Sequence, residues 1–263
     1  MELPAPHPPR AADSGCDQVA DPEADTVDVD LSGGLAALVA ERDAGAGAPP
    51  AGVPGSGSHY PAPAGTRAEP FGARGRLGGP DLLDDLPRWA AAHTAAGTFQ
   101  LVPVRLERDL PLIAAWMNDP AVAAFWDLAG PVGATASHLR AQLDGDGRSI
   151  PCLGVLDGVP MSYWEVYRAD LDPLARHYPA RPHDTGVHLL VGGVTDRGRG
   201  LGTTLLRAVG DLVLAHRPCC RRVLAEPDLR NVPSVAAFLG AGFRFSAEVD
   251  LPDKRAALMI RDR

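Results

Sequence analysis

A glycine-rich segment, Arg197-Gly198-Arg199-Gly200-Leu201-Gly202, lies between a predicted strand and a predicted helix. Because glycine has no side chain, the backbone can approach a ligand closely at these positions. The free N–H groups in the first turn of the helix point at an anion, which the helix dipole also attracts. The segment predicts a pyrophosphate site, and an ordinary glycine-rich connection is the alternative. The predicted contacts are Arg197, Arg199, Gly200, Gly202 and Thr203.

A histidine and an aspartate form the second pattern. His188 lies within a predicted strand over residues 187–191, on the face opposite Val187, Leu189 and Val191, and Asp228 follows the next predicted strand. If these strands are neighbours, the two side chains meet at one end of the sheet, where a carboxylate that orients an imidazole forms a general base. From the residues alone, a core histidine and a helix-capping aspartate are the more common arrangement.

Aromatic and acidic residues follow one face of another predicted strand. Tyr163, Glu165 and Tyr167 share this face because side chains alternate along a strand. Together with Trp126, we expect them to line a slot for a chain that ends in an amine or a carboxylate. Aromatic packing on a half-buried strand explains the pattern equally well. The histidines show no ligand spacing, so the sequence predicts no metal site.

These residues require a mixed α/β domain over residues 99–263 to position them. Period-2 alternation predicts strands over residues 99–106, 150–156, 161–168, 187–191, 222–226, 243–249 and 255–260. Helical spacing predicts helices over residues 109–118, from Pro120 to Trp126, and over 135–143, 201–217 and 233–239. The Asp157-Gly158 pair predicts a hairpin turn, and Pro103 predicts an edge position for the first strand.

The first 98 residues differ in composition from the rest. They contain half of the 26 prolines and almost half of the 29 glycines, which predicts a long disordered arm over residues 1–98. The formal net charge of -8 lies entirely in this arm. The neutral remainder argues against a general nucleic-acid binder. No secretory signal and no membrane span are visible, so we expect a cytoplasmic protein.

A dinucleotide-binding interpretation competes for the glycine-rich segment. The spacing Gly198-x-Gly200-x-x-Thr203 lacks the third small residue of that fingerprint, although Glu226 ends the next strand, where a ribose-binding acid belongs. Too few residues follow Gly202 for a doubly wound sheet. The sequence therefore favours a different fold.

A third pattern, Asn231-x-x-Ser234-x-x-x-Phe238-x-x-x-Gly242-Phe243, follows the glycine-rich segment. Together the two resemble the paired acyl-CoA motifs of the GNAT superfamily. The resemblance implies a mixed β-sheet flanked by helices, loop amides that hold the pyrophosphate of acyl-CoA, and a helix after Asn231 that flanks the pantetheine arm. Phe238 departs from the pattern, because many members carry there a tyrosine that protonates the leaving thiolate.

Several other segments resemble the siderophore-biosynthesis branch of this superfamily, which includes lysine N-acyltransferases of mycobactin-type pathways, hydroxylysine acetyltransferases of aerobactin-type pathways and acyltransferases of desferrioxamine-type pathways. The segments are Trp116-Met117-Asn118-Asp119-Pro120, Phe125-Trp126, Tyr163 to Arg168, Gly186 to Gly192, Ala225-Glu226-Pro227-Asp228 and Leu251 to Arg255. The resemblance assigns catalysis to His188 and Asp228. It implies acetyl-CoA or succinyl-CoA as donor, a small amine or hydroxylamine as acceptor, and an amine N-hydroxylase as a pathway partner.

The acceptor is the side-chain amine or N-hydroxyamine of lysine, ornithine or cadaverine under this interpretation. A hydroxylamine nitrogen is neutral at pH 7, whereas an alkyl ammonium with a pKa of about 10.4 must first lose a proton. Phe238 and the absence of a visible second base therefore favour the hydroxylated amine. The alternatives are an N-acetyltransferase that acts on an antibiotic or a protein amine, and a non-catalytic acyl-CoA-binding module.

Overall fold

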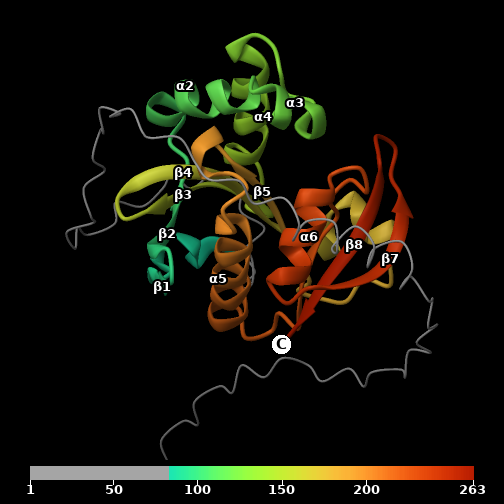
Figure 1. Ribbon diagram of the computed structural model, residues 1–263. Helices are drawn as coiled ribbons and strands as arrows, with labels where there is room; N and C mark the ends of the chain where they lie inside the picture. The colour runs from blue at the N-terminus through green and yellow to red at the C-terminus, as the bar shows by residue number, and fades with distance from the viewer. Residues whose placement is uncertain (1–82) are drawn as a thin grey trace, which may run out of the picture. The chain divides into compact units, whose positions relative to one another are not determined.

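The computed structural model describes residues 83–263, which form one mixed sheet with helices packed against it (Figure 1). The strands lie in the order β1-β2-β3-β4-β5-β6-β8-β7. They are β1 (Ala92–Thr94), β2 (Gly97–Pro103), β3 (Ser149–Leu156), β4 (Val159–Arg168), β5 (Thr185–Val191), β6 (Arg222–Ala225), β7 (Arg244–Asp250) and β8 (Arg255–Asp262). In the described sheet only β5 and β6 run parallel, so the GNAT-like mixed sheet is confirmed and the doubly wound alternative is excluded.

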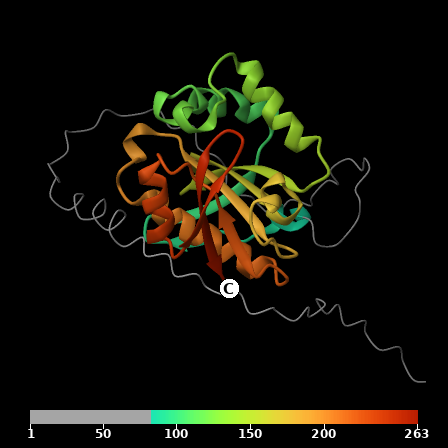
Figure 2. The ribbon, with the colours of Figure 1, turned by 90° about the vertical axis from the view of Figure 1, so that its right-hand side faces the viewer.

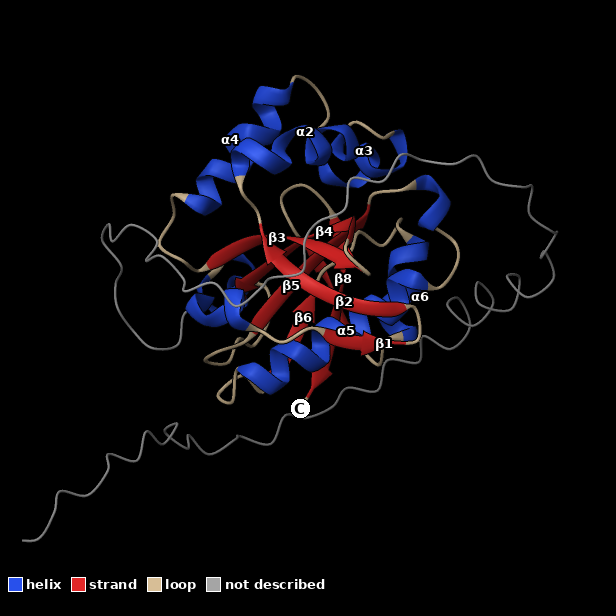
Figure 3. Cartoon of the chain, turned by 90° about the vertical axis from the view of Figure 1, so that its left-hand side faces the viewer, coloured by secondary structure: helices blue, strands red, loops and turns tan. Residues whose placement is uncertain are grey.

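Helices cover both faces of this sheet. The helices α2 (Leu106–Met117), α3 (Pro120–Trp126) and α4 (Val132–Leu143) gather on one side of it, and α5 (Leu201–His216) lies on the other (Figure 3). The short helix α6 (Val232–Gly240) packs on α5 and on β7 and β8. Four 3-10 helices complete the described elements: η2 (Leu83–Arg88), η3 (Ala169–Leu171), η4 (Pro173–Arg176) and η5 (Val194–Asp196).

Strand alternation divides the core into two layers. On β4, Trp164 and Val166 are buried with α5 and α6, whereas Tyr163 is buried with α2, α3 and α4. On β5, Val187 joins the α5 side and Leu190 the opposite side. Because successive side chains of a strand point to opposite faces, His188 must lie on the side of α2, α3 and α4.

The predicted turn chemistry is confirmed at the β3–β4 hairpin. Asp157 and Gly158 both have positive φ values, 47° and 81°, as a two-residue type I′ turn requires. The Asp157 carboxylate also accepts a hydrogen bond from the Thr98 backbone N–H at 2.8 Å, which fixes β2 beside the turn. Pro103 lies at the end of β2 that extends beyond β1, so it occupies the predicted edge position.

The domain begins earlier than the sequence predicted. Residues 83–98, assigned to the disordered arm, contain η2 and β1, and the side chains of Leu83, Leu86 and Trp89 are only 2%, 1% and 5% exposed. They pack into the same core as α5, so the boundary at residue 98/99 is wrong. The remaining part of the predicted arm, residues 1–82, lies outside the described residues. Between residues 83 and 263, no helix is long and apolar enough to cross a membrane.

Trp89 should therefore be essential for stability although it precedes the predicted domain. Its ring stacks on His216 of α5, with the ring centroids 5.3 Å apart and the planes 10° apart. Trp89→Ala removes a buried aromatic side chain, which costs about 3–5 kcal/mol of unfolding free energy. Urea unfolding followed by fluorescence measures the loss. The neighbouring Arg88→Ala is the control, because the Arg88 side chain is 80% exposed, and equal stability of both variants would contradict the packing described for η2.

A buried ion pair joins β5 and β6 where both strands begin. Asp184, which is fully buried, accepts hydrogen bonds from Nε and Nη2 of Arg222 at 3.0 and 2.5 Å. The hydroxyl of Tyr178 and the backbone N–H of Arg181 donate to the same carboxylate. Paired and hydrogen-bonded in this way, the two charges are compensated inside the protein.

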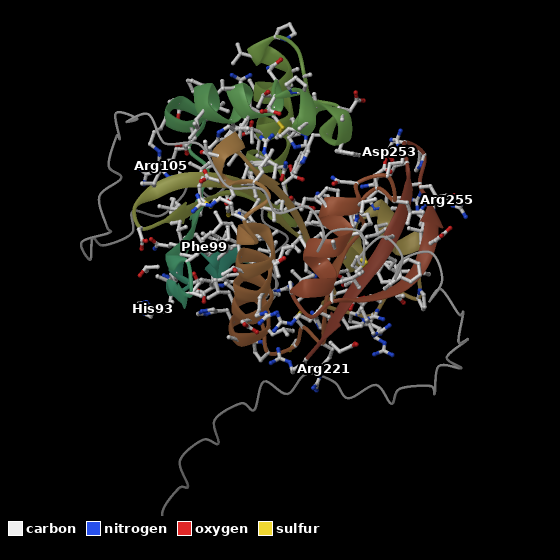
Figure 4. All side chains as sticks on the ribbon, viewed as in Figure 1. His93, Phe99, Arg105, Arg221, Asp253 and Arg255 are labelled. Atoms are coloured by element: carbon white, nitrogen blue, oxygen red, sulfur yellow. The ribbon has the colours of Figure 1, made fainter. Side chains whose placement is uncertain are left out.

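The two ends of the sheet have different surroundings. Figure 4 shows Arg221, which precedes β6, at one end, and Asp253 of the β7–β8 turn and Arg255 at the start of β8 at the other. The β7–β8 hairpin faces the viewer in Figure 2, and its turn lies at the same end of the sheet as α3. This turn brings the Lys254 ammonium to 3.6 Å from the carboxylate of Glu226.

Candidate active site

The site is built where β5 and β6 stop pairing. These strands pair only through Thr185 with Val223 and Gly186 with Leu224. β5 then continues to Val191, whereas β6 ends at Ala225. We call this short parallel junction the seam. Side chains rather than backbone hydrogen bonds connect the two strands beyond it.

His188 connects them. Its Nε2 lies 2.5 Å from Oε1 of Glu226, the residue after β6, and its Nδ1 lies 2.9 Å from Oε2 of Glu165 on β4. Glu165 is directly opposite His188 in the β4–β5 register. The imidazole is therefore held on both sides by carboxylates, while 33% of its side chain remains exposed.

Further donors hold the two carboxylates. Oε1 of Glu165 lies 2.5 Å from Nε2 of His138 and accepts hydrogen bonds from the Gln142 amide at 2.7 Å and the Tyr163 hydroxyl at 2.8 Å. The Tyr167 hydroxyl donates to Oε2 of Glu226 at 2.8 Å. Because buried carboxylates are costly unless they are hydrogen-bonded, this network keeps both charges in place beside the imidazole.

The same contacts set the protonation states. Burial alone would lower the pKa of His188, but attraction to Glu226 and hydrogen bonds to both carboxylates outweigh it and raise that pKa to about 10. Burial alone would raise the pKa of Glu165, yet hydrogen bonds from His138 and His188 hold it well below its usual value. For Glu226, the charge and hydrogen bond of His188 outweigh burial and lower the pKa to about 2. The unit is an imidazolium between two carboxylates at neutral pH.

The residues predicted to line an acceptor slot do come together. The Trp126 ring meets Tyr163 edge-on at 5.5 Å and His188 edge-on at 6.1 Å, and Tyr167 lies 4.8 Å from the His188 ring. Tyr167 has room because its cross-strand partner is Gly186, where a Cβ atom would lie 2.0 Å from the ring. The aromatic side chains thus surround the imidazole on the side of α3 and α4.

A pocket of about 600 Å³ opens beside this cluster. Its lining comes from α4, the loop before β3, β4, the η3–η4 segment and β5. Glu165, His138 and His188 line it, together with Tyr167, Arg148 and Asp172. The pocket gives a small molecule access to the imidazole and to polar groups of both charges.

The predicted contact between His188 and Asp228 is absent among the described residues. Asp228 is 7% exposed, and its carboxylate binds the Arg230 guanidinium at 2.6 Å and the Arg230 backbone N–H at 2.8 Å. The side chain turns to this local partner because Arg230 lies only two residues away. Glu226, also two residues away but in the other direction, takes the place beside the imidazole, so the predicted geometry is corrected.

The glycine-rich loop has the backbone shape that an anion site needs. Gly198 and Gly200 have φ values of 72° and 76°, a region that favours glycine, and Gly200 directly precedes α5. Arg199 is exposed beside them, and Thr203 lies in the first turn of α5, packed against Gly240. A Cβ atom at Gly202 would meet only Ala237, at 3.8 Å, so the first turn of α5 is open in the described structure.

Arg197 makes contacts within the protein. Its guanidinium donates to the carbonyls of Val191 and Gly192 at 2.9 Å and to Asp119 at 3.0 Å. Asp119 also caps α3 by accepting from the Ala121 N–H. These contacts tie the loop after β5 to the start of α3, and the predicted contact of Arg197 with a cofactor stays a prediction.

The third motif closes the opposite side of the loop. Asn231 precedes α6, and its side-chain oxygen accepts a hydrogen bond from the Ser234 N–H at 3.2 Å. Phe238 is buried and packs edge-on against Phe243, with the ring centroids 5.1 Å apart. Asn231 is thus a helix cap, and its predicted contact with a cofactor stays a prediction.

Two residues of the cluster were missed from the sequence. Glu226 was considered only as a ribose-binding acid, although it stands two residues before Asp228. His138 was set aside because it shows no ligand spacing. The signal for His138 was its helical spacing from Gln142, which puts both side chains on one face of α4. Within residues 83–263, no group of three or more His, Cys, Asp or Glu side chains is arranged to hold a metal ion.

Comparison with known proteins identifies the family of the chain. The family model for an acetyltransferase (GNAT) domain matches residues 105–251. The lysine N-acyltransferase MbtK of Mycolicibacterium paratuberculosis is 38% identical over 183 residues, which cover 70% of this chain and 81% of that protein. The N(6)-hydroxylysine O-acetyltransferase of Escherichia coli is 35% identical over 59% of this chain and 49% of its own length.

A solved structure extends the comparison to the fold. An uncharacterized protein from Bacillus halodurans is 32% identical, with a TM-score of 0.62, over 66% of this chain and 89% of that one. Lysine N-acyltransferases, named from the sequence motifs, are among the relatives, so the predicted resemblance is confirmed. This chain belongs to the GNAT family and is an acyl-CoA-dependent acyltransferase.

Proposed function

We propose that this enzyme transfers an acyl group from acetyl-CoA or succinyl-CoA to the side-chain amine or N-hydroxyamine of lysine, ornithine or cadaverine, as a step in the synthesis of a hydroxamate siderophore. The observation that carries the proposal is the imidazole of His188, held between Glu165 and Glu226 at the mouth of a polar pocket. The names of the relatives, a lysine N-acyltransferase and a hydroxylysine acetyltransferase, support this acceptor class. A hydroxylated acceptor requires an amine N-hydroxylase as pathway partner. The cytoplasmic compartment stays a prediction.

The donor binds at the glycine-rich loop in this proposal. The N–H groups of the first turn of α5 face the pyrophosphate of acyl-CoA, and the exposed Arg199 adds a positive charge. The thioester then lies along β5 toward His188, because η5 leads directly from the end of β5 at Val191 to this loop. Asn231 and α6 border the pantetheine arm on the other side.

The reaction forms one C–N bond and breaks one C–S bond. The acceptor nitrogen attacks the thioester carbonyl, CoA leaves as its thiolate, and the nitrogen loses one proton. Phe238 cannot supply a proton to the sulfur, but a thiolate is a stable leaving group because the pKa of a thiol is only about 8.5. A proton acceptor for the nitrogen is the catalytic group that the chain must provide.

His188 becomes the group that takes up this proton when the amine substrate binds. As an imidazolium with both nitrogens bonded to carboxylates it has no free lone pair. A cationic or polar acceptor that binds Glu226 competes for this carboxylate and removes one of the attractions that raise the pKa of His188. The pKa falls toward its ordinary value, the imidazole loses its proton to solvent, and Nε2 becomes free to take a proton from the attacking nitrogen.

Thiol release from acetyl-CoA or succinyl-CoA tests the proposal directly. We expect turnover of N6-hydroxylysine or N-hydroxycadaverine to exceed that of lysine or cadaverine at pH 7, with mass spectrometry locating the new hydroxamate. Preference for the plain amine would place acylation before hydroxylation. An aminoglycoside or a peptide amine as the preferred acceptor would contradict the siderophore assignment. If none of these amines causes thiol release, transfer to an amine is contradicted.

Gly202→Ala tests the donor site separately. The new methyl group has ordinary contact distance to Ala237, so the melting temperature should stay at or above that of the wild type. The methyl group blocks close approach of the pyrophosphate, so the KM for acyl-CoA should rise by about 10-fold or more, the loss of a hydrogen bond to a charged group. Gly133→Ala in α4, where a Cβ atom would meet nothing within 4 Å, is the control. Normal acyl-CoA binding by Gly202→Ala in calorimetry would contradict the assignment of this loop.

A further inference from the structure

The donor and the acceptor have separate approaches to His188. The glycine-rich loop follows the carboxyl end of β5, at Val191. The pocket of about 600 Å³ extends the other way, because it is lined by Tyr167 and Arg168, which pair with Gly186 and Thr185 at the amino end of β5. A molecule in the pocket therefore reaches the imidazole with one end and has its other end near the loop before β3 and the η3–η4 segment.

A fixed guanidinium stands at that far end. Arg148 donates from Nε and Nη2 to the Asp146 carboxylate, at 2.9 and 2.5 Å, and from Nη1 to the carbonyl of Leu171 at 3.0 Å. An arginine has five N–H donors, so these contacts leave two of them available. Half of the Arg148 side chain is exposed, and it lines the pocket. The group is oriented before any ligand binds, which favours recognition of a carboxylate.

A carboxylate stands beside it. Asp172 follows Leu171 directly, and its Oδ1 caps η4 by accepting from the Leu174 N–H at 2.9 Å. In the described part of the chain no hydrogen bond to its Oδ2 is present, and the half-buried side chain lines the same pocket as His188. Burial raises the pKa of Asp172, since the ionised form loses hydration there. A ligand ammonium would restore the lost stabilisation of this carboxylate.

We propose that Arg148 and Asp172 recognise the far end of the acceptor and select an α-amino acid, one with an α-carboxylate and an α-ammonium, over a simple diamine. This inference rests on the proposed function. Arg148 binds the α-carboxylate with its two remaining N–H groups, and Asp172 binds the α-ammonium. The side chain of the amino acid then runs through the pocket and brings its terminal nitrogen to His188.

Arg148 and Asp172 distinguish acceptors by the charged groups at the far end of the molecule. A diamine offers the far end only an ammonium, so it uses Asp172 and makes no contact with the two remaining N–H groups of Arg148. A diamine acylated at that end with succinate offers only a carboxylate and uses Arg148 alone. An α-amino acid uses both residues. The loss of one hydrogen bond between charged groups weakens binding by about 10- to 100-fold.

The test compares N6-hydroxylysine with N-hydroxycadaverine as acceptors for the full chain, by thiol release. Wild type should favour N6-hydroxylysine in kcat/KM. Arg148→Met should lower kcat/KM for N6-hydroxylysine by about 10- to 100-fold, through KM, and leave N-hydroxycadaverine unchanged within about 2-fold. Asp172→Asn keeps the cap on η4, because its side-chain oxygen still accepts, and should raise the KM of both acceptors.

The control is Arg176→Met, which removes an exposed arginine of η4 that does not line the pocket. It should leave both acceptors and the KM for acyl-CoA unchanged. The inference would be overturned, while the proposed function stands, if Arg148→Met lowered kcat/KM equally for both acceptors or for neither of them. If wild type releases no thiol with either acceptor, the proposed function itself fails, and the inference that rests on it fails with it.

Discussion

His188→Ala should lower kcat by about 10²–10⁴-fold, the contribution of a positioned general base, while acyl-CoA binds as in the wild type. Glu226→Gln should also lower kcat, because the acceptor loses the carboxylate that it binds beside Nε2 of His188. The double variant should then be little worse than the worse single variant. Single-turnover kinetics with a hydroxylated acceptor and calorimetry with CoA separate the two effects.

Asp228→Asn is the matched comparison for this result. The family resemblance predicts a catalytic role for Asp228, whereas the described geometry puts Glu226 next to the imidazole and pairs Asp228 with Arg230. If Glu226 is the functional partner, Asp228→Asn should have a much smaller effect on kcat than Glu226→Gln. The reverse order would restore the assignment predicted from the sequence. Full activity of His188→Ala would remove the histidine from catalysis altogether.

The pH dependence of the same reaction has a defined sign. Since the two carboxylates raise the pKa of His188 to about 10, the free enzyme keeps its proton through neutral pH, and kcat/KM should rise with pH well beyond 6.5. In Glu226→Gln one attraction is gone, so the rising limb should move to lower pH. A hydroxylated acceptor avoids interference, because its nitrogen is already neutral. If the rising limb of kcat/KM lies at the same pH in Glu226→Gln as in the wild type, a group other than His188 titrates in this range.

Asp184→Ala should lower the unfolding free energy by about 3–5 kcal/mol, because it leaves the Arg222 guanidinium buried without its counter-charge. The two strands of the seam begin at this pair, so the loss should also reduce activity at temperatures where most of the protein is still folded. Urea unfolding and activity at increasing temperature measure both effects.

The double variant Asp184→Leu with Arg222→Met is the control. Replacing both members of a buried ion pair by apolar side chains is often neutral or stabilising, so it should recover most of the lost stability. A double variant as unstable as Asp184→Ala would mean that the hydrogen bonds to Tyr178 and Arg181, rather than the ion pair, hold the seam.

The elements of the domain were predictable from local sequence, and the partners of His188 were not. The Asp157-Gly158 turn, the helical spacing of α5 and the alternation on β4 depend on residues close in the chain. The partner of His188 depends on where β5 and β6 stop pairing, a long-range property with no local signal. Two carboxylates, Glu226 and Asp228, are within reach in the sequence, and Arg230 decides between them by binding one.

The missed start of the domain has a different cause. Leu83, Leu86 and Trp89 follow a Pro- and Gly-rich stretch, and Pro87 interrupts them, so composition assigned them to the arm. Their three-residue spacing suits a short 3-10 helix of two turns, in which residues three apart share a face, and Trp89 directly follows this helix. Averaging composition over a long window hid an apolar face that is only three side chains wide.

The short seam also divides the sheet into two units that differ in how they hold together. Strands β1 to β5 each pair with their sequence neighbour, and β6 to β8 form a second group, joined to the first through two residue pairs and the crossover helix α5. Such a junction is where a sub-global opening starts, since few backbone hydrogen bonds must break. Both substrates are proposed to bind across it, and any ligand that binds only the closed form adds its binding free energy to closure. Acyl-CoA and the acceptor therefore act as structural ligands as well as reactants, because the loaded enzyme resists local unfolding at the place where the empty enzyme is weakest.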